Sequence, residues 1–174
     1  LQKARAPVLV LGSQVALRTE KLALLSEKLD GLGIPMFLAG MARGLLGADH
    51  CLQFRHGRGQ ALKEADLVII AGMPCDFRLD YGRQINPDAD YIAINRSKEA
   101  LKLNKKPHLA VHADPCTFLL ALADECRDLR RDRFSGGPAR GFLSSLAADE
   151  AIFAADLAVD RAHVVGLAEQ GILE

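Results

Sequence analysis

The run Leu67–Ala71 (LVIIA), closed by Gly72, constrains the fold of this chain most strongly. A short apolar run that is rich in Val and Ile and bounded by turn residues is typical of a buried β-strand rather than a helix. Four further strands of this kind are expected at 7–11, 34–39, 91–95 and 109–112. Because these strands are apolar along almost their whole length, they predict a parallel sheet that is covered on both faces.

Helical spacing of apolar residues appears between the predicted strands. Helices are expected at 20–32, 58–64 and 115–127, with a helical turn at 98–103. Thr19 is a plausible N-cap of the first helix, and Gly31 and Gly33 are expected to stop it. The stretch 48–57 is expected to be polar and irregular. The inner face of the last helix is expected to consist of Phe118, Leu119 and Leu122. The alternation predicts an α/β fold, a Rossmann-like three-layer domain built on a parallel sheet.

The character of the sequence changes after Leu129. A charge run at 130–133 and a Gly-Pro breaker cluster behind it lead into an Ala-rich stretch of helical spacing. We therefore expect two parts, an α/β domain at 1–129 and a C-terminal helical appendage at 130–174. The chain starts at Leu1 rather than Met, which is expected of a piece of a longer protein or of a processed one.

Composition argues against several classes of partner and site. Lys and Arg number 22 and so do Asp and Glu, so no net field favours nucleic acid or an anionic membrane. No apolar stretch approaches membrane-spanning length and no signal peptide is visible, so a cytoplasmic chain is expected. The four cysteines have no CxxC spacing, which predicts free thiols rather than a zinc site.

Candidate binding residues stand where the predicted strands end. Ligands of an open α/β sheet bind outside the carboxyl ends of its strands, so these residues could share one crevice. They are Gly12, Ser13, Asp76, Arg78, Asn95 and Asp114. A carboxylate or an amide there can hydrogen-bond a ribose, and an arginine can hold a phosphate. Each also has a structural interpretation, as a tight turn, a local ion pair or, for Asp114, a helix cap.

A second candidate is a glycine-rich loop that contains Arg43 and follows the predicted strand at 34–39. Such a loop can let the backbone come close to a ligand, and plain loop geometry is the alternative. No catalytic set is visible. None of the five histidines stands near a Ser or Cys in a way that predicts a nucleophile, and no HExxH motif exists. No metal-binding residues are therefore expected in this chain.

Four segments together resemble a known family. They are Gly40–Gly47, Ala61–Gly72, Cys75–Arg83 and Tyr91–Arg96. They resemble the central domain of thiamine-diphosphate-dependent enzymes of the acetolactate synthase type, closest to the acetolactate synthase-like proteins related to 2-hydroxyacyl-CoA lyases. The resemblance covers about residues 1–127. It implies a parent enzyme of three α/β domains that binds thiamine diphosphate and magnesium between its first and third domains, so the catalytic glutamate and the diphosphate-binding motif are expected elsewhere.

The resemblance also implies a nucleotide site, because the middle domain of some relatives binds FAD or ADP. The positions that match are Gly12, Gly72, Asp76, Arg78, Asn95 and Asp114. The chain departs from the nucleotide-binding pattern at Met73-Pro74, where relatives often have Ala-Arg, and at Asn95, where an acidic residue is usual. An amide can still hydrogen-bond a ribose hydroxyl, whereas Pro74 supplies neither a charge nor an N–H. Binding of FAD or ADP is therefore an open expectation.

The segment Arg133–Leu173 resembles a different family, the amino-terminal part of argininosuccinate lyase. In that family a serine and an aspartate that match Ser145 and Asp149 lie near the substrate. An Ala-rich helical appendage with chance similarity is the alternative. A chain that joins parts of two enzymes is expected to be a fusion, a gene-prediction artefact or an artificial chimera.

The leading functional hypothesis is a non-catalytic central domain with a structural role, in which nucleotide binding is open. A free-standing nucleotide-binding module and a fragment of an argininosuccinate lyase fusion are the alternatives. The parent is expected to be a lyase or a transferase, and this chain alone is expected to be inactive. Its expected partners are the missing domains of the parent and, in a homo-oligomer, further copies of itself.

Overall fold

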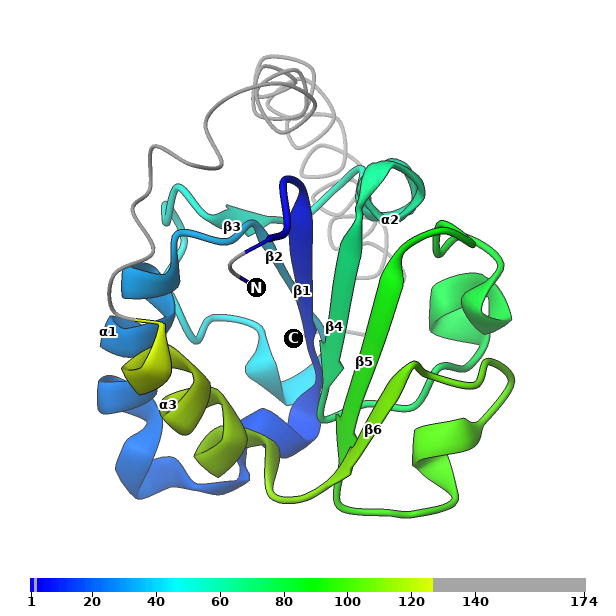
Figure 1. Ribbon diagram of the computed structural model, residues 1–174. Helices are drawn as coiled ribbons and strands as arrows, with labels where there is room; N and C mark the ends of the chain where they lie inside the picture. Colours follow the sequence, from blue (N-terminus) through cyan, green and yellow to red (C-terminus); the bar gives the residue numbers. More distant parts are fainter. Residues whose placement is uncertain (2, 127–174) are drawn as a thin grey trace, which may run out of the picture. The chain divides into compact units, whose positions relative to one another are not determined.

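The computed structural model describes residues 1 and 3–126 (Figure 1). Its centre is a six-stranded parallel sheet in the order β3-β2-β1-β4-β5-β6. The strands are β1 Pro7–Leu11, β2 Met36–Leu38, β3 Gln53–Phe54, β4 Leu67–Ala71, β5 Asp90–Asn95 and β6 Leu109–His112. The predicted Rossmann-like α/β fold with a parallel sheet is confirmed.

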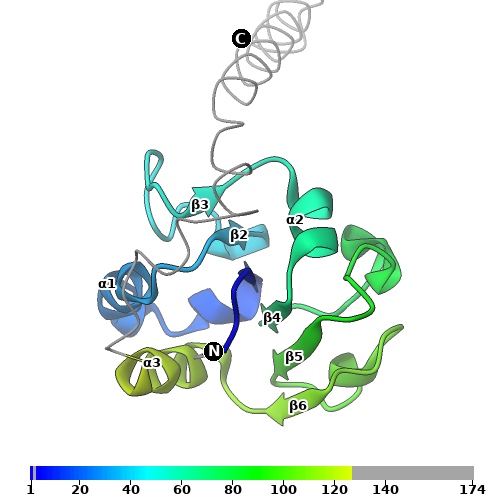
Figure 2. The ribbon, with the colours of Figure 1, turned by 45° about the horizontal axis from the view of Figure 1, so that its top comes forward.

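Helices cover both faces of this sheet (Figures 1 and 2). The helices α1 Leu22–Leu32 and α3 Pro115–Glu125 pack against each other on one face, and α2 Arg58–Glu64 lies on the other. Short 3-10 helices occur in the connections, namely η1 Ser13–Leu17, η2 Thr19–Lys21, η3 Gly40–Ala42, η4 Phe77–Gly82 and η5 Ala100–Lys102. The three-layer arrangement is therefore as predicted, and the turn expected at 98–103 is η5.

The two central strands are apolar throughout because both of their faces are covered. All five residues of β1 and all five of β4 are buried, and the strands pair along their whole length. Asp66 fixes the start of this pairing, since its carboxylate accepts the backbone N–H of Arg5 at 2.6 Å and of Ala6 at 2.9 Å. The edge strand β6, by contrast, is mostly exposed.

Two strand predictions need correction. The stretch 48–57 contains β3, which pairs with β2 through Gln53 and Phe54. An edge strand of two residues is too short to leave an alternating pattern in the sequence, which is why it was missed. The strand expected at 34–39 is shorter than predicted, because only its middle three residues form β2.

The expected limits of α1 also need correction. Thr19 does not cap this helix but lies in η2, and α1 itself begins at Leu22 behind Lys21. Gly31 does not stop the helix either, since it lies inside it. The helix ends at Gly33, whose φ of 65° is in the left-handed region that glycine adopts without strain.

The inner face of α3 is only partly as predicted. Leu119 is fully buried, together with Cys116 and Ala123. Phe118 and Leu122 are only half-buried, because they line a cavity of about 900 Å³ that lies over β4–β6. The helix therefore packs on α1 through one narrow stripe.

All four cysteines are free thiols, as expected, with Cys75 and Cys116 buried. In the described range, no helix combines the length and the apolar character that crossing a membrane requires. The boundary expected near 130, the helical appendage behind it, and the positions Ser145 and Asp149 all lie outside the described residues.

Candidate functional site

The strand order reverses between β1 and β4, and the loops that follow these two strands meet at the carboxyl edge of the sheet. Gly12 donates its N–H to the carbonyl of Ala71 at 2.8 Å. A Cβ at Gly12 would lie 2.4 Å from the Cβ of Met73 and 2.6 Å from the carbonyl oxygen of Gly72. The two predicted glycines are therefore needed for the close packing of the loops against each other.

Ser13 extends this packing to the loop that follows β2. Its hydroxyl accepts the N–H of Met41 at 3.2 Å, and a Cβ at Gly40 would lie 2.2 Å from the same oxygen. The loops that follow β1, β2 and β4 therefore form one connected layer at this edge. That a ligand binds on this layer stays a prediction.

Gln14 bridges the crevice and was not among the predicted binding residues. Its Nε2 donates to Oδ1 of Asn95 at 3.0 Å, and its Oε1 accepts the N–H of Arg96 at 3.0 Å. The side chain thus spans from the loop after β1 to the end of β5. No sequence signal could have found this contact, because 81 residues separate Gln14 and Asn95 along the chain.

Asn95 is the one buried polar side chain in the described part of the chain, with 1% of its surface exposed. Its Oδ1 accepts from Gln14 and also from the N–H of Ser97 at 2.9 Å. Its Nδ2 is buried and has no hydrogen-bond partner among the described residues. A buried donor without a partner is costly, by about 1–3 kcal/mol, so this amide is a natural place for an oxygen of a ligand to bind.

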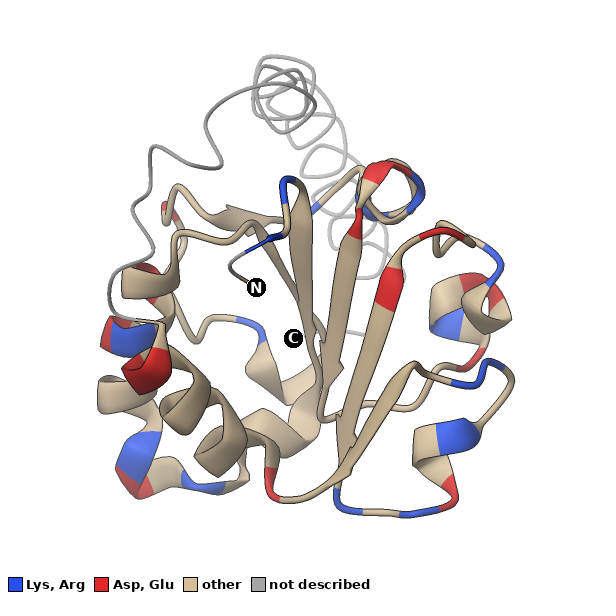
Figure 3. Ribbon diagram, in the orientation of Figure 1, with Lys and Arg blue, Asp and Glu red and all other residues tan. Residues whose placement is uncertain are grey.

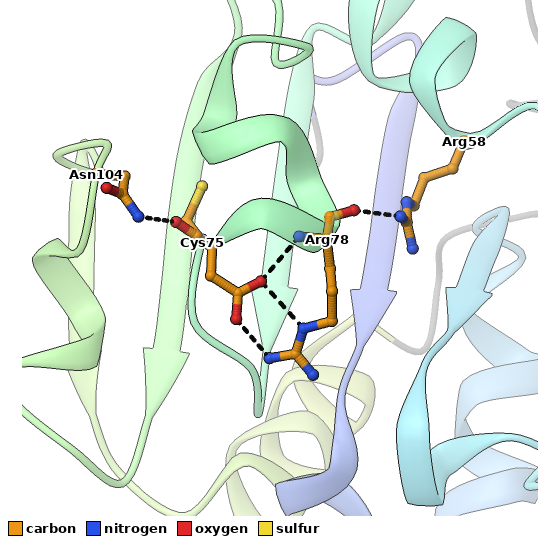
Figure 4. Close-up of polar contacts among 5 residues, drawn as sticks. Arg58, Cys75, Arg78 and Asn104 are labelled. Carbon is orange, nitrogen blue, oxygen red and sulfur yellow. Dashed lines mark hydrogen bonds and ion pairs between the residues drawn. The ribbon is translucent and has the colours of Figure 1, made fainter.

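Asp76 and Arg78 form the local ion pair that was the structural interpretation of these residues (Figure 4). The Asp76 carboxylate accepts from Nη2 of Arg78 at 2.7 Å and from its Nε at 3.0 Å. It also accepts the backbone N–H of Arg78 at 3.0 Å, which caps η4. Figure 4 shows Arg58 reaching from α2 to the Arg78 carbonyl, so the loop is tied to that helix as well.

The backbone of η4 is strained at two residues that follow Arg78. Asp80 has a φ of 47° and Tyr81 a φ of 55°, and neither is a glycine. Left-handed conformations of such residues cost of order 1–3 kcal/mol each and are concentrated at functional sites. The exposed rings of Phe77 and Tyr81 lie on the same loop. Strain and exposed aromatic surface together mark the η4 loop as a candidate contact surface.

Cys75 lies beside the pair and is buried. Burial raises the pKa of its thiol, so the reactive thiolate is disfavoured. Burial likewise raises the pKa of Tyr91, whose hydroxyl lies against this thiol. The carbonyl of Cys75 accepts from Nδ2 of Asn104 at 2.8 Å, which holds the loop in place (Figure 4).

We expect the stability of the protein to depend on the ionisation of Asp76. The hydrogen bonds from Arg78 lower the pKa of this carboxyl, so the pair stabilises the fold at neutral pH and is lost as the pH falls through the lowered pKa. Asp76→Asn should therefore cost about 0.5–1 kcal/mol at pH 7 and less at an acidic pH below the ordinary carboxyl range, measured by urea unfolding at both pH values. Asp49→Asn, at an exposed carboxylate, is the control. An equal cost of Asp76→Asn at both pH values would contradict this interpretation.

Asp114 caps α3, as the structural interpretation of this residue expected. Its Oδ1 accepts the N–H and the hydroxyl of Thr117, both at 3.0 Å, and lies 3.7 Å from Nε of Arg18. Partial burial opposes the ionisation of Asp114, but hydrogen bonds from Thr117 and the charges of Arg18 and Arg96 outweigh it and lower the pKa of this carboxyl.

Replacement of Asp114 should therefore separate the capping role from the charge. Asp114→Ala removes the cap and is expected to lower the free energy of unfolding by about 1 kcal/mol. Asp114→Asn keeps an acceptor oxygen for the N–H of Thr117 and should cost about half as much or less. Thermal or urea denaturation of both variants measures the difference. Equal losses would mean that the charge, rather than the cap, stabilises the helix.

The predicted site residues thus form three groups rather than one. Gly12, Ser13, Gly72 and Asn95 meet where the loops after β1, β4 and β5 converge. Asp76 caps η4 and Arg78 lies within it, on the α2 side, and Asp114 caps the start of α3. Figure 3 shows that charged residues are nearly absent from the strands and lie on the helices and loops around them. Within residues 1 and 3–126, no group of three or more His, Cys, Asp or Glu could hold a metal ion.

Comparison with known proteins identifies the family. The family model described as thiamine pyrophosphate enzyme, central domain, matches residues 1–122. The chain is 46% identical over 128 residues to 2-hydroxyacyl-CoA lyase 2 of Caenorhabditis elegans. It is 44% identical over 128 residues to the protein of that name from Homo sapiens. Both alignments cover 71% of this chain and 20% of the relative, so the chain spans about a fifth of the length of these curated relatives.

Two further matches were found. The X-ray structure of a protein from Mycobacterium smegmatis, described as a thiamin diphosphate-dependent enzyme, superposes with a TM-score of 0.58 at 21% identity. This match covers 78% of this chain and 27% of that one, and it supports the fold alone. Argininosuccinate lyase of Natronomonas pharaonis is 83% identical over 52 residues, which are 29% of this chain and 11% of the lyase. Both predicted resemblances are confirmed, the second over a short stretch, and the chain belongs to the thiamine pyrophosphate enzymes through their central domain.

Proposed function

We propose that this chain is the central domain of a thiamine-diphosphate-dependent lyase that acts on 2-hydroxyacyl-CoA substrates, and that the domain itself makes or breaks no bond. Relatives that are 43–46% identical to it carry the name 2-hydroxyacyl-CoA lyase 2. The described residues offer no group of three or more His, Cys, Asp or Glu that could hold the magnesium ion. In the parent enzyme other domains would hold thiamine diphosphate and magnesium.

The role that we propose for the domain is to bind a nucleotide, ADP or FAD, at the crevice between β1, β4 and β5. The buried and unpaired Nδ2 of Asn95 carries this proposal. A ribose hydroxyl could accept a hydrogen bond from this amide. The Gln14 side chain covers Asn95, so a nucleotide would have to displace it.

The test is a thermal-shift titration of the full chain with ADP, FAD and CoA. A ligand that binds only the native state, and is present at 100 times its Kd, adds about 2.7 kcal/mol to the free energy of unfolding. For a domain of this size this raises the melting temperature by roughly 8 °C. Gln14→Ala uncovers Asn95 and should raise the affinity for ADP. Gln60→Ala, at an exposed glutamine on α2, is the matched control. No shift with any ligand, in the wild type and in Gln14→Ala, would exclude nucleotide binding at this crevice.

The carboxyl edge of the sheet also has exposed apolar surface on which the missing domains of the parent enzyme, or a second copy of this chain, could dock. Four large apolar side chains are exposed on the loops that follow β1, β2 and β4, namely Leu17, Met41, Phe77 and Tyr81. Exposed apolar surface at one edge is typical of an interface. Sedimentation velocity should therefore detect self-association of the isolated chain, and Met41→Ser together with Phe77→Ser should reduce it. A strictly monomeric wild type at high concentration would argue against this part of the proposal.

A second candidate function rests on the 83% identity to an argininosuccinate lyase over 52 residues. We propose that the matching stretch comes from a fused segment of such a lyase and is inactive in this chain. Because the match spans 11% of the lyase, most of the enzyme that builds the active site has no counterpart in it. An assay for fumarate release from argininosuccinate should show no turnover, and measurable turnover would contradict this assignment.

A further inference from the structure

The amide of Asn95 offers a ligand free hydrogen-bond donors but no free acceptor. Its orientation is fixed by the backbone N–H of Ser97, which can only donate and therefore faces Oδ1, at 2.9 Å. Oδ1 also accepts from Nε2 of Gln14 at 3.0 Å, so both of its lone pairs are used. Nδ2 is buried and has no partner among the described residues. A group that binds to this amide must therefore be an acceptor.

Displacement of Gln14 by a ligand adds one more donor at the same place. Oε1 of Gln14 accepts the backbone N–H of Arg96 at 3.0 Å, and this N–H becomes free when the side chain moves away. The same movement frees one lone pair of Oδ1 of Asn95. Three N–H donors, two on Nδ2 and one on the backbone, then face a ligand beside a single acceptor position. This set fits an anionic oxygen group, which only accepts, better than a hydroxyl, which also has to donate its own hydrogen.

The side chain of Arg96 brings positive charge to this end of β5. Its guanidinium is exposed and forms no hydrogen bond or close ion pair within the part of the chain that the structure describes. Its charge acts on the carboxylate of Asp114 at longer range. That carboxylate already accepts from Thr117 and lies 3.7 Å from Nε of Arg18. Arg96 is therefore available to an anionic ligand, and a guanidinium matches the oxygens of a phosphate especially well.

The place of Asn95 in the fold indicates which phosphate of a nucleotide would lie there. In open α/β sheets an acidic side chain at a strand end binds the hydroxyls of the ribose, whereas a nearby arginine accommodates a phosphate that the ribose carries. Asn95 and Arg96 have the second character, since they combine donors with a positive charge. The diphosphate of a nucleotide lies at the first turn of such a sheet, which is here the loop that begins at Gly12. A phosphate at the end of β5 is therefore a separate one, on the ribose.

We propose that the β5 end of the crevice prefers a nucleotide whose ribose carries a phosphate over the same nucleotide with a free ribose hydroxyl. This inference rests on the nucleotide binding proposed above and names the ligand class of that site. Asn95 determines the specificity through the donors of Nδ2, and Arg96 through its charge. Coenzyme A, whose ribose is phosphorylated at the 3′ position, belongs to this class, and so does NADP⁺, which is phosphorylated at the 2′ position.

The test is isothermal titration calorimetry of the full chain with two matched pairs of ligands. Coenzyme A is compared with dephospho-coenzyme A, and NADP⁺ with NAD⁺, so that the members of a pair differ only in the ribose phosphate. The phosphorylated member of at least one pair should bind about tenfold more tightly, and this ratio should fall with added salt. Gln14→Ala, which uncovers Asn95, should raise the affinities and keep the ratio.

Two variants test the residues that carry the preference. Arg96→Gln should lower the ratio by about threefold or more, because it removes a charge-assisted contact. Lys98→Gln, at an exposed lysine two residues further along, is the matched control and should leave the ratio unchanged. Asn95→Asp keeps oxygen acceptors for Gln14 and Ser97 but replaces the donors by a negative charge, so it should abolish the preference. Because a buried carboxylate weakens the fold, the exposed Arg96 provides the second and independent test.

Equal affinities within both pairs would overturn the inference, and so would a preference that neither Arg96→Gln nor Asn95→Asp changes. If ADP or FAD binds while both pairs show equal affinities, the nucleotide site proposed above holds and only the preference for a ribose phosphate fails. The absence of binding by every one of these ligands, in the wild type and in Gln14→Ala, would exclude both proposals.

Discussion

Gly12→Ala is expected to lower the free energy of unfolding by about 2–3 kcal/mol, although it adds a single methyl group. The added Cβ would lie 2.4 Å from the Cβ of Met73 and 2.6 Å from the carbonyl oxygen of Gly72. Neither neighbour is the far end of a flexible side chain, so the loops after β1 and β4 must move apart. Overpacking of this kind typically costs 1–3 kcal/mol. Urea unfolding, monitored by circular dichroism, measures the change.

Gly31→Ala is the matched control for this prediction. Gly31 lies inside α1, and a Cβ there would have no neighbour within 4 Å. The same substitution should therefore stabilise the protein, by about 0.5–1 kcal/mol, because alanine restricts the unfolded chain and favours the helix. If Gly12→Ala cost less than about 0.5 kcal/mol, the loops would be looser than the structure shows. The loops after β1 and β4 could then move apart at Gly12 with little cost in free energy.

Leu119→Ala is expected to have the largest effect of any single side-chain truncation in α3, a loss of about 3 kcal/mol. Leu119 has no exposed surface and belongs to the core cluster that joins α3 to α1 and to the sheet. Its removal leaves a cavity at the narrow stripe by which the helix packs. The half-buried neighbours Phe118 and Leu122 cannot fill that space from the margin of the helix.

Leu109→Ala is the control, since 51% of the Leu109 surface is exposed on the edge strand β6. It should change the free energy of unfolding by about 0.5 kcal/mol or less. The two variants can be compared by thermal denaturation and by amide exchange of the α3 backbone. A cost of Leu119→Ala below about 1 kcal/mol would mean that α3 is held mainly by its cap and by its contacts with η1.

Much of the fold could be predicted because its signals are local. The five longer strands were expected from apolar runs. Asp114 was recognised as a cap because Pro115 follows it at the start of an apolar helix. The predictions that were wrong, at Thr19, Gly31 and β3, concern the ends of elements or very short ones, where local signals are weakest.

The candidate site was harder to predict. In the described chain, each predicted site residue makes a hydrogen bond or a packing contact. The loops that carry these residues pack against one another. The ion pair of Asp76 and Arg78 was foreseen because the two residues are neighbours in sequence. The bridge from Gln14 to Asn95 was not foreseen. A sequence pattern does not reveal which distant side chains meet.

By itself, the sequence determined the α/β class, the parallel sheet, the family and the absence of a visible catalytic motif. These follow from apolar runs, turn residues and matched segments, all of which are readable over a few neighbouring residues. Only the tertiary structure decided that Gly12 lies against Met73, that Gln14 covers Asn95, and that Nδ2 of Asn95 is buried without a partner in the described chain. These contacts depend on the strand order and on how the loops pack across the carboxyl edge, and that packing is settled only when the sheet assembles.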